Sequence, residues 1–155
     1  MQNATLSAAD GKVPLHFEFC ILMNYLTRDE LLDLHTFAVE RYGGLLGIKS
    51  QDRLQTVLSA PLQEMFGAEL YPDLASKVAV MVYLLVKSHP FMGANDVTAL
   101  MALLRLLEIN GAALRPEIGA GELAYVFRAL NNSDMDKEGL EQWLRGSINE
   151  PGEAP

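Results

Sequence analysis

Two long apolar runs dominate the hydrophobic pattern of this chain, and a short polar segment separates them. The runs are Val78–Val86 and Leu100–Ile109, and the segment between them is His89–Thr98. Helices that are apolar on all sides are typical of a domain interior rather than of its surface. We therefore expect two central helices that hold the segment between them in a fixed geometry.

Shorter segments carry helix signals on both sides of this pair. Thr27 and Glu30 have the spacing of a capping box, and Gly43 follows the apolar periodicity as a helix stop. Ser50 is placed to cap a second helix that Pro61 ends. Together these signals predict an all-α bundle of about six helices, over residues 28–42, 51–59, 72–87, 96–109, 117–130 and 136–145.

The N-terminal region differs from the rest in its periodicity. Residues Val13–Ile21 alternate apolar with other side chains, which is typical of a strand, and Pro14 favours a sheet edge. Such a strand could pair with a second copy in a homodimer or with the segment Phe66–Leu70. We expect an arm over residues 1–24, a helical domain over 25–147 and a flexible tail over 148–155.

Composition narrows the function classes. The formal charge is −8, from 12 basic and 20 acidic residues, and such a surface disfavours direct binding to nucleic acid or to an anionic membrane. The single cysteine, Cys20, excludes an internal disulfide and a cysteine-based metal site, and it is expected to be a buried apolar side chain. No stretch has the length of a membrane span, and the predicted compartment is the cytoplasm.

The segment between the central helices has chemistry of its own. Pro90 disfavours helix at His89, and a histidine there is a candidate base near neutral pH. Gly93 permits a tight backbone, and Asn95 or Asp96 could cap the helix that follows. The N-terminus of that helix would attract an anion. An alternative is that the segment is only a helix connector. His35, in the first predicted helix, is expected to pack in or beside the core.

Residues 89–99, HPFMGANDVTA, resemble the signature loop of the Fic/Doc superfamily, H-x-F-x-[D/E]-[A/G]-N-[K/G]-R-T-A. Other segments, in the expected order, are similar to death-on-curing (Doc) proteins, and the resemblance covers roughly residues 25–147. These segments are Tyr25–Thr27, Leu34–His35, Glu40–Gly44, Gly47–Ile48, Leu58–Pro61, Tyr71–Leu74 and Leu107–Gly111.

The resemblance implies roles for the residues that match. His89 would be the general base that takes a proton from a hydroxyl of a target protein. Phe91 would pack into the core and anchor the loop. Asn95, with Ala94 and Asp96 at the helix start, would form the cradle for the phosphates of ATP or another nucleotide.

The departures from the family pattern lie on the phosphate side. Gly93 stands where the family has an acid that binds Mg²⁺, so Mg²⁺ binding is doubtful and no metal ligand is assigned. Asp96 and Val97 stand where the family has Lys or Gly, and Arg. An arginine on transferring phosphoryl charge is worth about 10³–10⁵ in rate. The expected catalysis is therefore weak or absent.

The resemblance also implies a β-hairpin flap, reduced in Doc-type members, between Leu62 and Tyr71. The residues show no clear two-strand pattern, so the reduced form is expected. Met65 and Phe66 could pack in the core or contact the target, and the core is the favoured expectation. Two functions stay open. One is a phosphoryl- or nucleotidyl-transferase acting on a protein of the translation machinery. The other is a non-catalytic member of a toxin–antitoxin system that binds a protein or an antitoxin-like peptide.

Overall fold

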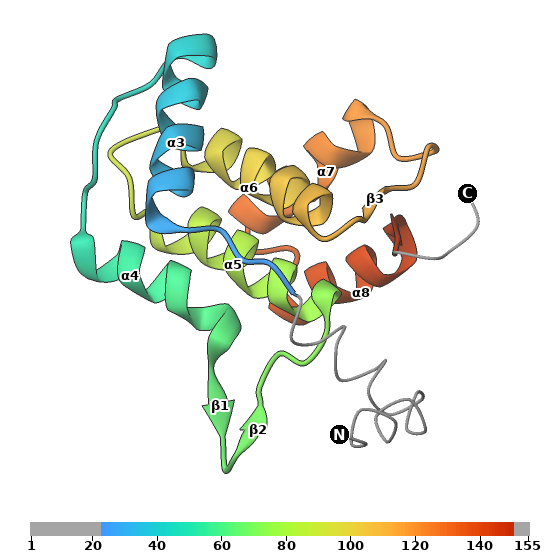
Figure 1. Ribbon diagram of the computed structural model, residues 1–155. Helices are drawn as coiled ribbons and strands as arrows, with labels where there is room; N and C mark the ends of the chain where they lie inside the picture. Colours follow the sequence, from blue (N-terminus) through green and yellow to red (C-terminus); the bar gives the residue numbers. More distant parts are fainter. Residues whose placement is uncertain (1–22, 151–155) are drawn as a thin grey trace, which may run out of the picture.

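The computed structural model describes residues 23–150 of the 155-residue chain. Within that range the protein is an all-α bundle of six α-helices with two very short antiparallel strand pairs, which confirms the predicted class (Figure 1). The helices are α3 (Arg28–Tyr42), α4 (Gln51–Ser59), α5 (Leu74–Ser88), α6 (Asn95–Ile109), α7 (Ala120–Asn131) and α8 (Lys137–Ser147), and a 3₁₀ turn, η1 (Ala60–Leu62), follows α4.

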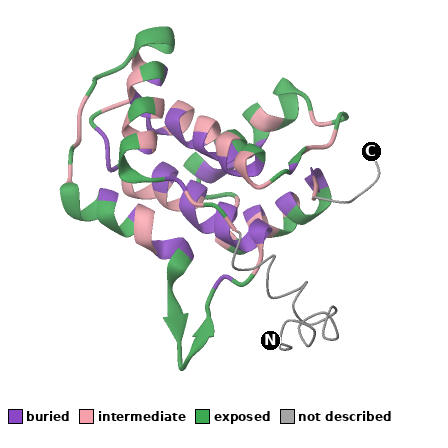
Figure 2. Cartoon of the chain, viewed as in Figure 1, coloured by how far each residue is buried: buried purple, intermediate pink, exposed green. Residues whose placement is uncertain are grey.

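Helix α5 is the centre of the bundle. It packs against α6, α8, α4, α7 and η1, and in Figures 1 and 2 it runs through the middle of the molecule as a largely buried helix. Its sequence is apolar on every face, and it buries eleven of its fifteen residues. The strongest apolar run in the sequence thus became the helix that most of the others cover, because burying such a run is the main favourable term in folding.

Helix α6 is less buried than its apolar sequence predicts. One of its faces packs on α5 and another on α3, but Leu104 is 44% exposed and Met101 is only half-buried. Two apolar surface depressions border its outer faces, one shared with α7 and one with α3. The expectation of two fully central helices is therefore wrong for α6, because the bundle has too few helices to cover both its sides.

Some of the predicted helix starts agree with the structure, and others are displaced by one to three residues. Thr27 and Glu30 form the capping box of α3, and the Ser50 side chain accepts from Arg53 N–H at the start of α4. Pro72 lies before α5 rather than in its first turn, because Asp73 takes the N-cap position and accepts from Ser76 N–H. α7 begins at Ala120, three residues later than expected, and α8 begins after the cap Asp136.

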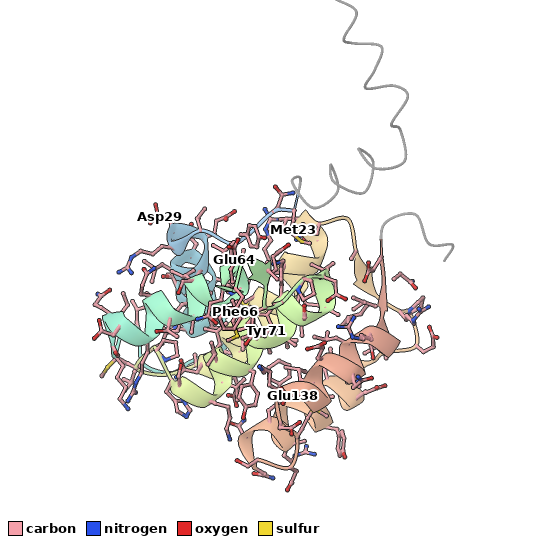
Figure 3. All side chains as sticks on the ribbon, turned by 90° about the horizontal axis from the view of Figure 1, so that it is seen from below. Met23, Asp29, Glu64, Phe66, Tyr71 and Glu138 are labelled. Carbon is pink, nitrogen blue, oxygen red and sulfur yellow. The ribbon has the colours of Figure 1, made fainter. Side chains whose placement is uncertain are left out.

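A hairpin projects from the bundle between η1 and α5. Strand β1 (Glu64–Met65) pairs with β2 (Ala68–Glu69), so two strands exist where the residue pattern indicated none. Phe66 and Gly67 form its turn with positive φ values of 53° and 80°, the geometry that matches the twist of a tight hairpin. Figure 3 views the molecule from this side and labels Glu64 and Phe66.

The expectation that Met65 and Phe66 belong to the core is wrong. Phe66 is fully exposed and Met65 is 54% exposed, because the hairpin extends away from the helices (Figure 2). Its base is tied to the bundle: the buried Lys77 of α5 forms an ion pair of 2.7 Å with Glu69 and donates to Pro61 O at 3.0 Å. The hairpin therefore presents apolar side chains to solvent while its base is held.

The two ends of the domain are bound to its body. Asn24 N–H donates to Asn110 Oδ1 at the end of α6, and strand β3 (Ala113–Leu114) pairs with β4 (Ile148–Asn149). Ile148 is buried, so the tail predicted from residue 148 loses its first two residues to the fold. The predicted strand Val13–Ile21 and Cys20 lie outside the described residues. Within residues 23–150, none of the helices has the length and hydropathy needed to cross a bilayer.

Candidate functional site

The segment joining α5 to α6, residues 89–94, is called the His89 loop here, and it begins with a strained residue. His89 is the C-cap of α5, with φ 52° and ψ 66° in the left-handed region. Pro90 excludes a helical conformation for the residue before it, so the helix must end at His89. A left-handed conformation is uncommon outside glycine. The turn leaves the His89 side chain exposed beside a surface cavity.

Phe91 holds the His89 loop against the core. Its side chain is completely buried, and its ring stacks on the His35 ring with centroids 3.9 Å apart and an angle of 10° between planes. Its backbone forms an isolated antiparallel bridge with Ile48. Burial of an aromatic ring is among the largest single contributions to stability that a loop residue can make. The structure thus places the sequence-predicted anchor inside the bundle.

Asn95 closes the loop from the other end. Its amide oxygen accepts from Phe91 N–H at 3.0 Å, and its amide nitrogen donates to Phe91 O at 3.1 Å. The same nitrogen lies 3.4 Å from His89 Nδ1. The expectation that Asn95 or Asp96 caps α6 is wrong: Ala94 is the N-cap, with φ 53° and no side-chain cap bond. The Asn95 amide is committed to Phe91 and faces the loop instead.

A second loop, Gly43–Gly47, lies against the His89 loop and is called the strap. Gly47 O accepts from Met92 N–H at 2.8 Å, next to the Ile48–Phe91 bridge. A Cβ added at Gly93 would lie 2.7 Å from Leu45 N and 3.3 Å from Leu45 O. Both contacts are with backbone, which cannot swing aside as a side chain can. The strap therefore occupies the space into which any larger residue at position 93 would extend.

The site cavity has a volume of about 470 Å³ and opens beside His89. Its polar lining comes from His89, Asn95, Asp96 and Asn131, and among its lining residues none is lysine or arginine. Its remaining lining residues are Met92, Gly93, Ala94 and Val97. All the sequence-predicted site residues except the buried Phe91 thus line one cavity.

Asn131 was missed by sequence reasoning, which placed it just after the helix predicted over residues 117–130. It is the last residue of α7, and its amide nitrogen donates to Asp96 Oδ2 at 2.6 Å. No local signal could have found it, because it lies 35 residues from its partner. The bond fixes the Asp96 carboxylate at the cavity, next to the first turn of α6. The one charged side chain lining the cavity is therefore an acid.

The residues that line the cavity beside His89 are a poor fit for Mg²⁺ and a nucleoside triphosphate. The residues at the loop offer no acid at position 93, and a Cβ there meets the strap. No cluster of three or more potential metal-binding side chains occurs in residues 23–150. A phosphate placed at the start of α6 would meet the Asp96 carboxylate and no basic lining residue.

Comparison with known proteins supplies an independent line of evidence. The family model of the Fic/DOC family matches residues 25–107, which is 83 of the 155 residues. The chain is 25% identical over 125 residues to "Toxin Doc" of Mycolicibacterium smegmatis, covering 81% of this chain and 94% of that protein. It is 32% identical over 89 residues to "Protein kinase doc" of Escherichia phage P1, covering 57% of this chain and 70% of that protein.

Proposed function

Because this chain belongs to the Fic/DOC family, we propose that it is a Doc-like member of a toxin family in which group transfer from ATP to a protein hydroxyl is weak or lost. The observation that carries the proposal is the contact between Gly93 and the strap. A Cβ at position 93 would lie 2.7 Å from a backbone nitrogen, so the site is built around the absence of a side chain there.

Electrostatics supports the same proposal. The cavity contains His89, which could take a proton, and Asn95, whose amide is bonded to Phe91. It contains the Asp96 carboxylate where a transferring phosphoryl group would bring further negative charge. A metal ion and an arginine at such a site each lower the barrier by several kcal/mol, about 10³–10⁵ in rate for the arginine. The base is retained and both charge-stabilising groups are absent.

Nucleotide binding and labelling test this proposal. Titration of the protein with ATP in a calorimeter should give little heat, with or without Mg²⁺. Incubation with ATP labelled in the γ-phosphate or in the adenine should leave the protein and candidate target proteins unlabelled. Labelling at a rate that His89→Ala abolishes would show that the transferase is active and would overturn the proposal.

Two variants that restore family residues test the effect of charge at the cavity separately from the effect of space at position 93. Asp96→Lys with Val97→Arg adds positive charge at the cavity without entering the strap, and we expect it to bind ATP measurably. Gly93→Asp must displace the strap backbone, so alone it should lower stability without giving Mg²⁺-dependent labelling. Mg²⁺-dependent labelling by Gly93→Asp alone would mean that the strap yields easily and that only one ligand has been lost.

A second candidate function is binding of a protein without catalysis, as a partner in a toxin–antitoxin pair. One observation favours it: Phe66 is fully exposed at the tip of the hairpin, with the exposed apolar residues Leu62, Met65 and Leu70 near it in sequence. Exposed apolar patches often mark protein-binding surfaces. The partner would be an antitoxin-like peptide or a protein of the translation machinery, met in the cytoplasm.

The hairpin can be tested separately from the cavity. Phe66→Ser should weaken capture of such a partner while leaving the thermal unfolding midpoint unchanged, because the side chain makes no core contact. Asp96→Lys with Val97→Arg is the matched change at the cavity and should not affect that capture. Sedimentation of the full chain would show whether it forms the homodimer that an N-terminal strand could support. Equal capture by both variants would exclude the hairpin as the binding surface.

A further inference from the structure

His35 contacts three separate parts of the candidate site from the protein interior. It lies in α3 and is 2% exposed. Its ring stacks on Phe91 of the His89 loop, its Nε2 accepts from Gly47 N–H of the strap at 3.1 Å, and its Nδ1 lies 3.2 Å from Thr98 Oγ1 of α6. Two of these elements, the His89 loop and α6, line the cavity, and the strap packs against Gly93 and Ala94 of the His89 loop.

The hydrogen bonds around His35 select one neutral form of its ring. The Thr98 hydroxyl donates its only proton to Ala94 O at 2.7 Å, so it can only accept from His35 Nδ1. Gly47 N–H donates to His35 Nε2, which must therefore carry a lone pair. Two independent contacts thus require the neutral ring with its proton on Nδ1. A protonated ring would set an N–H at Nε2 against the Gly47 N–H.

The strap depends on Gly47 for its attachment to the site. Gly47 N–H is bound by His35, while Gly47 O binds Met92 N–H at 2.8 Å. Gly43, Gly44 and Gly47 have φ values of 90°, 113° and 127°, a backbone that only glycine adopts without strain. A loop with three such glycines in five residues is inherently flexible, so its position must be set by contacts rather than by its own stiffness.

We propose that His35 is a positioning residue for the candidate site: its neutral imidazole latches the strap to the His89 loop and so fixes the position of that loop, whose residues line the cavity. The inference rests on the proposed function only in taking the His89 loop as the functional site. It gives a role to a histidine that touches no ligand-facing atom. It also explains why the strap backbone stays against Gly93 rather than moving away.

The stabilisation that the His35 latch provides should decrease as the pH falls. The groups that contact the ring are the Gly47 N–H from the strap, the Thr98 hydroxyl from α6 and the Phe91 ring from the His89 loop, and none is charged. Burial lowers the pKa of His35 from its ordinary value. In the unfolded chain the ring titrates at about pH 6.5. The stabilisation by the latch is therefore complete above that pH and is lost as the pH falls through the lowered pKa.

Nitrogen NMR of the histidine rings tests the required ring form. The full-length chain contains three histidines, and the His35 signal is identified by its absence in His35→Gln. At pH 7.5 it should show a protonated Nδ1 and an unprotonated Nε2, and it should stay unprotonated to a pH below the ordinary histidine pKa of about 6.5. A His35 ring protonated at Nε2, or one that titrates like an exposed histidine, would overturn the proposal.

Hydrogen exchange of the Gly47 and Met92 amides tests the latch itself. In His35→Asn, a donor can still reach Thr98 but no acceptor reaches Gly47, so both amides should exchange about tenfold faster or more. In His35→Gln, whose amide oxygen extends as far as Nε2, protection should return in part. Thr36→Ala, on the same helix with its hydroxyl bonded to Leu32 O, is the control and should not change these amides.

Hydrogen exchange measured at several pH values uses the unaltered protein, so this test holds even where a variant fails to fold. After correction for the intrinsic pH dependence of exchange, protection of Gly47 and Met92 should fall between pH 7.5 and 5 while amides in α5 keep theirs. Unchanged strap protection at low pH, or in a folded His35→Asn, would overturn the latch. No nucleotide is present, so this result and the ATP labelling result can fail independently of each other.

Discussion

The His89 loop has an inner side that faces the core and an outer side that faces the cavity, and the two differ in burial, charge and hydrogen bonding. On the inner side, Phe91 is fully buried and Asn95 binds both its backbone groups. On the outer side, Met92 is 50% exposed, and Gly93 and Val97 offer neither charge nor hydrogen-bonding side chains to the cavity. The inner side is the part that supports a loop, and the outer side is the part that would grip a ligand. The core-facing contacts are all present, whereas no lysine or arginine lines the cavity.

This contrast shows that the contacts that hold the loop are separate from those that a ligand would use. The inner contacts are made with the protein's own core, so folding itself maintains them. The cavity-facing side chains would be contacted mainly by a bound molecule, so they contribute little to stability, although Gly93 also lies against the strap. Changes on the two sides should therefore have very different consequences for the free energy of unfolding.

The largest effect is expected from Phe91→Ala. The change removes a fully buried ring and its stack on His35, and it should lower the free energy of unfolding by about 3–5 kcal/mol. The measurement is denaturant unfolding followed by circular dichroism. Met92→Ala, the neighbouring residue on the outer side, is the control and should change stability by about 0.5 kcal/mol or less. Similar losses in both variants would contradict the contrast.

Asn95→Ala should have the next largest effect. It leaves Phe91 N–H and Phe91 O without their side-chain partner in a buried position, at a cost of about 1–3 kcal/mol for each group left unpaired. Thermal and denaturant unfolding measure the loss. Asn131→Ala is the matched change of an exposed asparagine that also contacts the site, and it should cost clearly less. If both cost the same, Asn95 acts no more as a support than Asn131 does.

Gly93→Ala tests whether the outer side is closed by the strap. The added methyl group would meet the Leu45 backbone at 2.7 Å, and the forced shift should cost about 1–3 kcal/mol. Gly121→Ala, in α7 with open space around its Cβ position, should instead stabilise by up to about 1 kcal/mol. A neutral Gly93→Ala would show that the strap moves aside freely and that position 93 was not closed by it.

The smallest effect is the pH dependence of stability that comes from His35. Because burial lowers its pKa, the unfolded chain binds a proton at a higher pH than the folded chain. Stability should therefore fall as the pH drops below about 6.5 and level off below the lowered pKa. Denaturant unfolding at several pH values measures it, with His35→Gln as the reference. A steeper fall in His35→Gln than in the unaltered protein would reverse the assigned sign.

How much could be predicted from the sequence varies along the chain. The helix over residues 28–42 was predictable because Thr27 and Glu30 act on neighbouring backbone groups. The same local reasoning failed for Asn95, which has the chemistry of a cap but uses it on Phe91. It also failed for Phe66, where an apolar side chain indicated the core and the hairpin carried it into solvent. Local signals hold where their partners are local.

By itself, the sequence determined the helical class, the central place of α5 and the identity of the loop that carries His89, since hydrophobic periodicity and capping act within a few residues. Only the tertiary structure decided what that loop faces. The strap against Gly93, the Asn131 amide on Asp96 and the three contacts of His35 join residues far apart along the chain. Their geometry depends on how helices pack, because it is packing that brings distant backbone within hydrogen-bonding range.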